Sequence, residues 1–219
     1  FSRGYQAELR GDFQEAVRWY LKAADNEDPS AMYNLGVLYH NGTGVIQNYI
    51  QSFQWYCKAA YKGHVRSMYM VGVYYDNGYG MEQDYKGAVY WYRKAADEGN
   101  EDAMCNLGVR YDRGQGVSQD SKQAVSWYHK AASKGSVCAM YNLGVHYSNG
   151  QGVTQNYAQA NKWYLKAAES GDTDAMNNLG IHYQYGRGVP KDIGQAVKWF
   201  KKAAEAGHEQ AAENLRKLR

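Results

Sequence analysis

Histidine, cysteine, hydroxyl and carboxylate side chains are the groups most able to bind a metal or transfer a proton, so their spacing is the first test for chemistry. The histidines are His40, His64, His129, His146, His182 and His208. No two of them are three or four residues apart, the spacing that would place two ligands on one helix face. No serine, cysteine or carboxylate stands beside a recognisable base, as nucleophilic catalysis requires. The sequence therefore predicts no catalytic residue, no metal site and no cofactor, and we do not expect an enzyme.

Sulfur-containing residues offer a second route to metal binding. Thioethers suit soft metals such as copper, and five methionines recur at one spacing: Met32, Met68, Met104, Met140 and Met176. Each falls among the apolar residues of a different segment, so we expect them to pack in the core. Three cysteines are too few and too unevenly placed for a disulfide framework. Free thiols are the expectation, a bridge between Cys105 and Cys138 is the alternative, and the redox compartment stays open.

Paired glycines form a third pattern, G-x-G, which in some proteins cradles a phosphate. The pairs are Gly42/Gly44, Gly78/Gly80, Gly114/Gly116, Gly150/Gly152 and Gly186/Gly188. A dinucleotide-binding loop needs a preceding strand and a third glycine at the start of a helix, and neither is present. We therefore expect these glycines to shape turns.

All these patterns share one period. The phrase "AMYNLGVLYHNGTGV" at Ala31 returns, with changes, at Ser67, Ala103, Ala139 and Ala175. The tryptophans keep the same 36-residue step: Trp19, Trp55, Trp91, Trp127, Trp163 and Trp199. A fixed period of this size indicates an array of stacked units, none of which can bury its apolar face alone.

Each unit reads as two helices. In the copy that starts at Ala103, apolar residues recur at helical spacing, Gly108 allows close approach of a neighbour, and Gly114 ends the helix. Asp120 with Gln123 then forms a capping box for a second helix, and Gly135 ends that helix. The unit is therefore helix, glycine loop, helix and turn.

These motifs resemble the Sel-1-like repeat, a relative of the tetratricopeptide repeat. The matching pattern is A-x-x-x-L-G-x-x-Y-x-x-G-x-G-V followed by D-x-x-x-A-x-x-W-Y-x-K-A-A-x-x-G, in five copies. The resemblance implies an all-α fold, a right-handed superhelical solenoid of antiparallel helix pairs. The expected organisation is a partial, tetratricopeptide-like repeat at 1–30, full repeats at 31–66, 67–102, 103–138, 139–174 and 175–210, and a capping helix at 211–219. Phe1 falls partway through a repeat, which indicates that the natural N-terminus precedes it.

Charge and hydropathy exclude two classes of partner. The formal net charge is +3, and basic and acidic residues are mixed, so no nucleic-acid-binding stripe is present. No apolar run reaches the roughly 18 residues that a membrane-spanning helix needs. We expect a protein or peptide partner, no nucleic acid, no membrane insertion and a monomer.

The resemblance places the first helix of each repeat on the concave wall of the array. The residues expected to face outward there are Tyr33, Asn34, Tyr69, Tyr74, Asn106, Arg110, Arg113, Tyr141, Asn142, His146, Asn178 and His182. A row of asparagines can both donate to and accept from the backbone of an extended peptide. The N-terminal tyrosines favour apolar side chains, and the C-terminal arginines and histidines favour an acidic segment or a carboxylate. The alternative is that the asparagines only link adjacent helices.

The resemblance implies a non-catalytic scaffold, an adaptor that binds a peptide or protein segment in a concave groove. Similar proteins act in bacterial signalling, the bacterial envelope, host interaction and degradation at the endoplasmic reticulum, so the compartment stays open. A glycan- or peptidoglycan-binding envelope protein and a regulatory fragment of a larger enzyme are the alternatives.

Overall fold

A computed structural model describes residues 1–218 of the chain, and within that range it contains thirteen α-helices and no strand. Seven occupy the first-helix position of a repeat, and we call them the first helices: α1 Ser2–Leu9, α3 Pro29–Asn41, α5 Val65–Asn77, α7 Glu101–Arg113, α9 Val137–Asn149, α11 Thr173–Tyr185 and α13 Glu209–Lys217. The second helices are α2 Phe13–Asp25, α4 Tyr49–Tyr61, α6 Tyr85–Asp97, α8 Ser121–Ser133, α10 Tyr157–Glu169 and α12 Ile193–Glu205. The prediction of an all-α repeat fold is confirmed.

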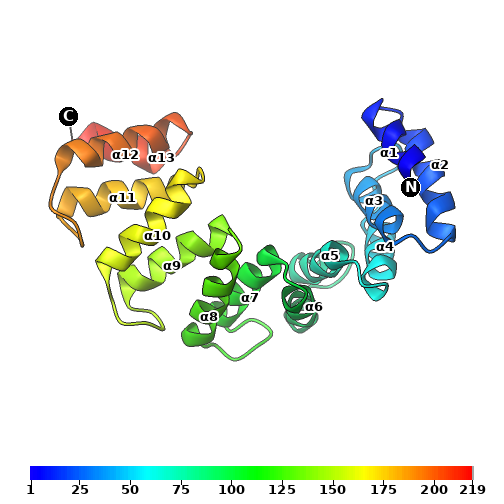
Figure 1. Cartoon of the computed structure of the whole chain (residues 1–219), viewed down its shortest axis with the longest axis horizontal. Helices are drawn as coiled ribbons and strands as arrows, with labels where there is room; N and C mark the ends of the chain where they lie inside the picture. The colour runs from blue at the N-terminus through cyan, green and yellow to red at the C-terminus, as the bar shows by residue number, and fades with distance from the viewer. Residues whose placement is uncertain (219) are drawn as a thin grey trace. The chain divides into compact units, whose positions relative to one another are not determined.

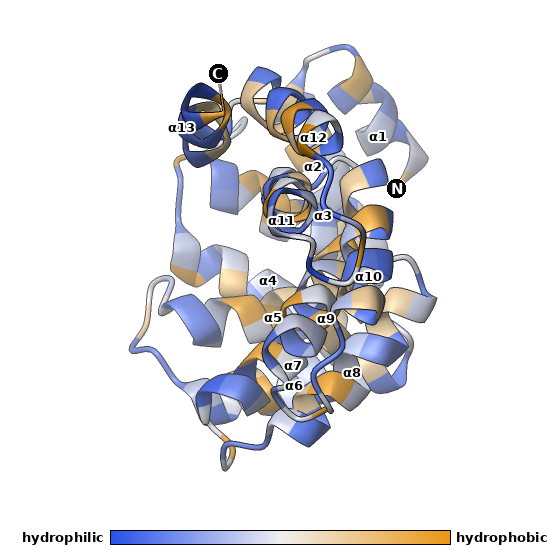
Figure 2. Ribbon diagram, turned by 90° about the vertical axis from the view of Figure 1, so that its left-hand side faces the viewer, coloured by the Kyte–Doolittle hydropathy of each residue, from blue (hydrophilic) through white to orange (hydrophobic). Residues whose placement is uncertain are grey.

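The chain forms two compact units that divide near the end of α7. Unit 1 comprises Phe1–Arg110 with Gly114–Ser118, and unit 2 comprises Tyr111–Arg113 with the chain from Gln119 onward. From α1 to α6 in unit 1, and from α8 to α13 in unit 2, each helix packs against the next helix in the sequence. Figure 1 labels the helices in this order. Figure 2 shows hydrophobic and hydrophilic segments within single helices, as expected of helices that bury one face.

In both units, helix pairs close through an aromatic ring that lies on a glycine. A Cβ added to Gly36 of α3 would lie 2.5 Å from Cε1 of Tyr56 in α4, and Gly72 and Tyr92 repeat this relation at 2.6 Å. Tyr56 and Tyr92 are fully buried. The predicted role of this glycine, to allow close approach of a neighbouring helix, is confirmed.

The G-x-G loops are structural. Gly42 ends α3 in the left-handed conformation, with φ of 70°. Gly44 also has a positive φ, and a Cβ there would lie 2.7 Å from the backbone of Phe13 at the start of α2. The first glycine therefore turns the chain, and the second lets the loop lie against the preceding repeat.

The second helices have the predicted N-cap side chains but not the reciprocal bond of a capping box, because the N–H of Asp120 donates to the carbonyl oxygen of Tyr111 at 3.0 Å and not to the Gln123 side chain. The side chains of Asn48, Asp84, Asp120, Asn156 and Asp192 accept hydrogen bonds from backbone N–H groups in the first turn. These bonds satisfy donors that have no partner within the helix. The start of each second helix is thus fixed by one local residue.

The apolar columns pack in the core, with one difference from expectation. Met32 and Met104 are buried, and the other three methionines of the column are partly buried. Trp91 and Trp199 are buried, whereas the remaining four tryptophans are only half-buried. A lysine three residues later covers every indole ring; Lys130 lies 3.9 Å from the ring centre of Trp127. This cation–π contact shields the exposed part of the ring.

Candidate functional site

A hollow on the first helices of unit 1 is the part of the predicted surface that the structure brings together. It has a volume of about 300 Å³ and is lined by Tyr33, Arg66, Tyr69, Met70, Asn100, Glu101 and Asp102. These residues come from α3, α5 and the start of α7. Three successive first helices therefore build one pocket, which we call the first-helix pocket.

Aromatic packing holds the two tyrosines of this pocket in place. The ring of Tyr33 lies 5.7 Å from that of Tyr56 and 4.9 Å from the imidazole of His64. The ring of Tyr69 lies 6.0 Å from that of Tyr92. Both pocket tyrosines stay half-exposed, so each offers a rigid surface to a bound group.

The charged rim of the pocket combines opposite signs. Arg66 belongs to the first turn of α5, and Glu101 and Asp102 to the first turn of α7. Burial raises the pKa of Asp102, the nearby Glu101 carboxylate raises it further, and Arg66 opposes both. Burial also raises the pKa of Tyr69, and the negative charge of Asp102 adds to the effect. The pocket can therefore pair with a cation, an anion or both through its rim.

The asparagine row is half-buried, and three of its members interact with tyrosine hydroxyls. Burial raises the pKa of Tyr69 and Tyr92, and the side-chain amide of Asn106 lowers both by hydrogen bonding to the hydroxyls. Asn178 acts in the same way on Tyr141 and Tyr164. These amides therefore link tyrosines of neighbouring helices, and only their remaining hydrogen-bonding capacity is open to a partner.

The other asparagines follow a similar pattern. The Asn34 side chain opposes the rise in the pKa of Tyr20 that burial and Glu8 cause, and Asn142 donates to the backbone oxygen of Cys138 at 2.9 Å. Tyr141 is half-exposed, and Arg113 is exposed at the end of α7. All of these positions keep some accessible surface.

Four residues that we expected to face outward are buried instead. The exposed fractions are 0% for Tyr74, 7% for Arg110, 4% for His146 and 3% for His182. They share one position of the repeat, and each bonds to a residue 34 positions earlier, on the preceding first helix. The expectation that these side chains contact a partner is therefore wrong. They are buried, and they contact residues of the preceding first helix instead.

In unit 1 this repeat position holds Tyr74 and Arg110, and the two side chains make different contacts with the preceding first helix. The Arg110 guanidinium donates from Nη1 to Oδ1 of Asp76 at 2.9 Å, and the Tyr92 hydroxyl donates to Oδ2 of the same carboxylate at 3.1 Å. The Tyr74 hydroxyl donates to Oγ of Ser52 at 2.6 Å and lies 2.7 Å from Nδ1 of His40. The first connection is a buried ion pair, and the second contains no formal charge pair.

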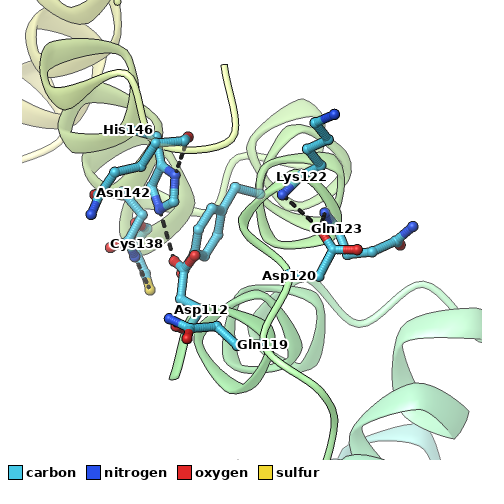
Figure 3. Close-up of polar contacts among 10 residues, drawn as sticks. Asp112, Gln119, Asp120, Lys122, Gln123, Cys138, Asn142 and His146 are labelled. Carbon is cyan, nitrogen blue, oxygen red and sulfur yellow. Dashed lines mark hydrogen bonds and ion pairs between the residues drawn. The ribbon is translucent and has the colours of Figure 1, made fainter. Parts of the chain in front are cut away.

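In unit 2 the imidazole of His146 has an acceptor at each nitrogen. Nε2 lies 2.7 Å from Oδ2 of Asp112, and Nδ1 lies 2.8 Å from the carbonyl oxygen of Gln151. Figure 3 shows the ring pointing at the Asp112 carboxylate. Burial alone would lower the pKa of His146, but the Asp112 hydrogen bond, the Gln151 carbonyl and the Asp112 charge together raise it. Only the doubly protonated ring satisfies both acceptors.

The equivalent His182 has the opposite environment. Nδ1 lies 2.6 Å from Oδ1 of Asn161, and Nε2 lies 3.3 Å from Oγ of Ser148. The amide of Asn161 donates to the carbonyl oxygen of Arg187, so its own oxygen faces the imidazole. Burial, and then the charge of Arg187, lower the pKa of His182 to about 4. A neutral ring that donates once and accepts once fits this site.

Sequence reasoning overlooked these connections, although a signal for them was present. Arg110 with Asp76 and His146 with Asp112 are complementary pairs at the same 34-residue separation. A search for complementary side chains at one repeat length minus two would have found both pairs.

The cysteines do not form a reactive site. Cys57 is a free thiol, and burial raises its pKa to about 11, so it is protonated at neutral pH. Cys105 and Cys138 are disulfide-bonded, which corrects the expectation that all three thiols are free.

No group of three or more His, Cys, Asp or Glu side chains within residues 1–218 could hold a metal ion. None of the helices described is long and apolar enough to span a bilayer.

Comparison with known proteins identifies the family. A family model described as Sel1 repeat matches residues 3–28, 29–64, 65–100, 101–136, 139–172 and 173–208, which is nearly the whole chain. The chain belongs to the Sel1 repeat family. Sel1 repeat proteins are generally protein-interaction scaffolds, and the fold is typically non-catalytic. The resemblance drawn from the sequence motifs is confirmed.

Solved structures of other Sel1 repeat proteins resemble this chain over nearly its full length. A protective antigen of uropathogenic Escherichia coli is 38% identical with a TM-score of 0.91, and the match covers 97% of this chain and 46% of that one. A Sel1 repeat protein of Oxalobacter formigenes is 32% identical with a TM-score of 0.91, covering 98% of this chain and 87% of that one. This Sel1 repeat chain therefore spans less than half the length of the first of these structures.

One curated relative is a component of a larger assembly. The ERAD-associated E3 ubiquitin-protein ligase component HRD3B of Arabidopsis thaliana is 49% identical over 45 residues, which is 20% of this chain and 7% of the plant protein. The match therefore concerns a short stretch of repeats.

Proposed function

We propose that this Sel1 repeat chain is a non-catalytic adaptor that binds a segment of a partner protein on its first helices, with the first-helix pocket as the main contact. The single observation that carries the proposal is the pocket itself, where two fixed tyrosine rings, a methionine and charges of both signs converge from three helices. A pocket of about 300 Å³ has the size of one large side chain, at the lower end of known ligand pockets.

Met70 adds an apolar contact to a pocket whose lining is otherwise mainly polar. Asn34, Asn106, Asn142 and Asn178 hold the same position in the other full repeats. A thioether in place of an amide adapts its shape to an apolar side chain, and flexible methionines are frequent on binding surfaces. An aromatic or aliphatic side chain of the partner therefore fits between the two tyrosines.

The half-exposed asparagines extend this contact along the first helices. Successive helices in a pair-wise stack lie 8–10 Å apart, close to the length of three extended residues. An extended segment anchored in the pocket can therefore reach an asparagine on a neighbouring first helix. Tyr33, Tyr69 and Asn106 are the predicted residues that we retain for this surface in unit 1, and Tyr141, Asn142 and Asn178 those in unit 2.

The test begins with the partner that copurifies with the chain and is identified by mass spectrometry. Its binding is then titrated against the wild-type chain and the double variant Arg66→Ser with Met70→Asn, which carries residues found at these positions in other repeats. We expect at least tenfold weaker binding, because a buried anchor residue commonly contributes more than about 1.4 kcal/mol. Tyr185→Asn is the matched control, on an exposed tyrosine of unit 2. Equal affinity of the double variant and the wild type would contradict the proposal.

A further inference from the structure

A cluster of exposed aromatic residues lies on the second helices of unit 1, outside the first-helix pocket. Tyr61 at the end of α4 is 77% exposed, and Tyr90 in α6 is 54% exposed. Both rings lie 5.5 Å from the ring of Trp91 and nearly perpendicular to it, at 78° and 86°. We call Tyr61, Tyr90, Trp91 and Lys94 the second-helix patch.

The repeats themselves show that the fold does not need this patch. The position of Tyr61 is hydrophilic in the other repeats, where it is Asp25, Asp97, Ser133, Glu169 and Glu205. The position of Tyr90 is also hydrophilic, and holds Arg18, Gln54, Ser126, Lys162 and Lys198. Two separate positions therefore depart from the repeat pattern, and both departures contact the same tryptophan.

Exposed aromatic rings in such a cluster are a liability for solubility unless they contact a partner. Tyrosine and tryptophan are enriched among the residues that dominate protein–protein binding, because they bury much area and lose little conformational entropy. Trp91 is only 6% exposed and is held by its packing. The rings of Tyr61 and Tyr90 therefore pack against a buried side chain, which restricts their motion.

Two lysines lie beside aromatic rings of α4 and α6, and the nearest acidic residues in the sequence, Asp97 and Glu98, follow Lys94 at the end of α6. The Lys94 ammonium lies 4.8 Å from the ring centre of Tyr90 and 5.2 Å from that of Trp91. Lys58 lies 4.2 Å from the ring centre of Trp55 on the same helix as Tyr61. Neither lysine forms an ion pair within residues 1–218. Helix α4 contains no acidic residue, since Tyr61 stands where most other repeats carry Asp or Glu.

We propose that the second-helix patch binds a protein segment in which an aromatic or aliphatic side chain is flanked by Asp or Glu. The apolar side chain would pack against Tyr61 and Tyr90, and a carboxylate would pair with Lys94. Because Lys94 is already held over two rings, little rotamer freedom is lost when the ion pair forms. This surface is built by second helices and does not rest on the function proposed for the first helices.

The test is a phage-displayed library of random twelve-residue peptides, selected on the full chain. Selected peptides are synthesised and titrated against the wild type and against Tyr61→Asp and Tyr90→Lys, which place residues of the other repeats at each position. We expect sequences that combine an aromatic or aliphatic residue with Asp or Glu, and at least tenfold weaker binding to each variant. Lys94→Gln should weaken binding and reduce its dependence on salt, since it removes one ion pair.

Two sets of controls make the outcome decisive. Circular dichroism and thermal melting establish that the variants fold, and Tyr185→Asn removes a 62% exposed tyrosine from unit 2 without an expected effect on these peptides. Arg66→Ser with Met70→Asn should also leave them bound, which separates this surface from the first-helix pocket.

Three results would overturn the proposal. The first is a set of selected peptides whose affinity is the same for the wild type, Tyr61→Asp and Tyr90→Lys. The second is binding to a glycan array that both substitutions abolish while no acidic peptide is enriched, which would make the patch a carbohydrate surface. The third is self-association in sedimentation experiments that the substitutions abolish, which would assign the patch to a second copy of the chain.

Discussion

His182 should make unit 2 sensitive to acid. Its pKa is about 4 in the folded chain, against 6.5 for an ordinary histidine. The unfolded chain therefore binds more protons between these two values, and the free energy of unfolding falls as pH drops. Each pH unit in that window is worth about 1.4 kcal/mol, so lowering the pH from 7 to 4.5 should cost about 3 kcal/mol through this residue.

The assay compares two proteins at two pH values. Wild-type chain and His182→Gln are unfolded with urea at pH 7 and at pH 4.5, so that the carboxylates common to both cancel. The wild type should lose about 3 kcal/mol more than the variant between the two conditions. NMR titration of the imidazole C–H signals supplies the pKa directly.

His146 provides the internal contrast because its pKa is raised. The stability that it contributes is present below the unfolded pKa and is lost as pH rises through the folded value. The two histidines should thus titrate on opposite sides of 6.5, although they occupy the same repeat position. Equal losses for wild type and His182→Gln, or a His182 signal that titrates at 6.5 or above, would refute the reasoning.

Three further predictions concern single residues. Arg110→Met should lower the free energy of unfolding by about 3–5 kcal/mol in urea titrations, because it leaves the carboxylate of Asp76 without its buried partner, and adding Asp76→Asn should recover part of the loss. Gly36→Ala should destabilise the chain, although alanine gains roughly 1 kcal/mol over glycine in a helix, because the added Cβ meets the buried ring of Tyr56. The exposed helical Gly194→Ala should be neutral or stabilising, and melting temperatures that rank the two variants in reverse would count against the packing argument. A thiol reagent should label Cys57 slowly in the native chain and one thiol per chain after unfolding without reductant, and three labelled thiols would contradict the disulfide.

The helices could be predicted from the sequence because the residues that start, end and pack each helix lie within one repeat. Asp120 caps its helix, Gly42 ends its helix, and Gly36 admits the ring of Tyr56, each as the repeat pattern predicted. These features depend on neighbours within one repeat, and the 36-residue period presents them several times over.

The candidate site was predicted only in part because its residues depend on the next repeat. Arg110 and His146 were expected to face outward because they lie on the side of the first helix opposite its apolar residues. In the array that side of the helix faces the preceding first helix, where Asp76 and Asp112 bind these side chains. Variation along this position looked like specificity for a partner, but it reflects a different internal bond at each step.

The first-helix pocket could not be predicted from the spacing of residues along one helix either. Its walls are set by the packing of Tyr33 on His64 and of Tyr69 on Tyr92, which are tertiary contacts. The second-helix patch, in contrast, is visible in an alignment of the repeats with one another, where Tyr61 and Tyr90 stand out among hydrophilic residues.

The bonds made 34 residues apart also determine whether repeats can be exchanged. Removing residues 67–102 would leave the apolar core of each pair intact, yet it would bring Arg110 opposite His40, which has no carboxylate to offer. The repeats have the same backbone fold, but a different pair of side chains joins each repeat to the one before it. The stability of the fold should therefore depend on the order of the repeats. Shuffled or shortened versions would need the residue at each new junction rewritten to match its neighbour.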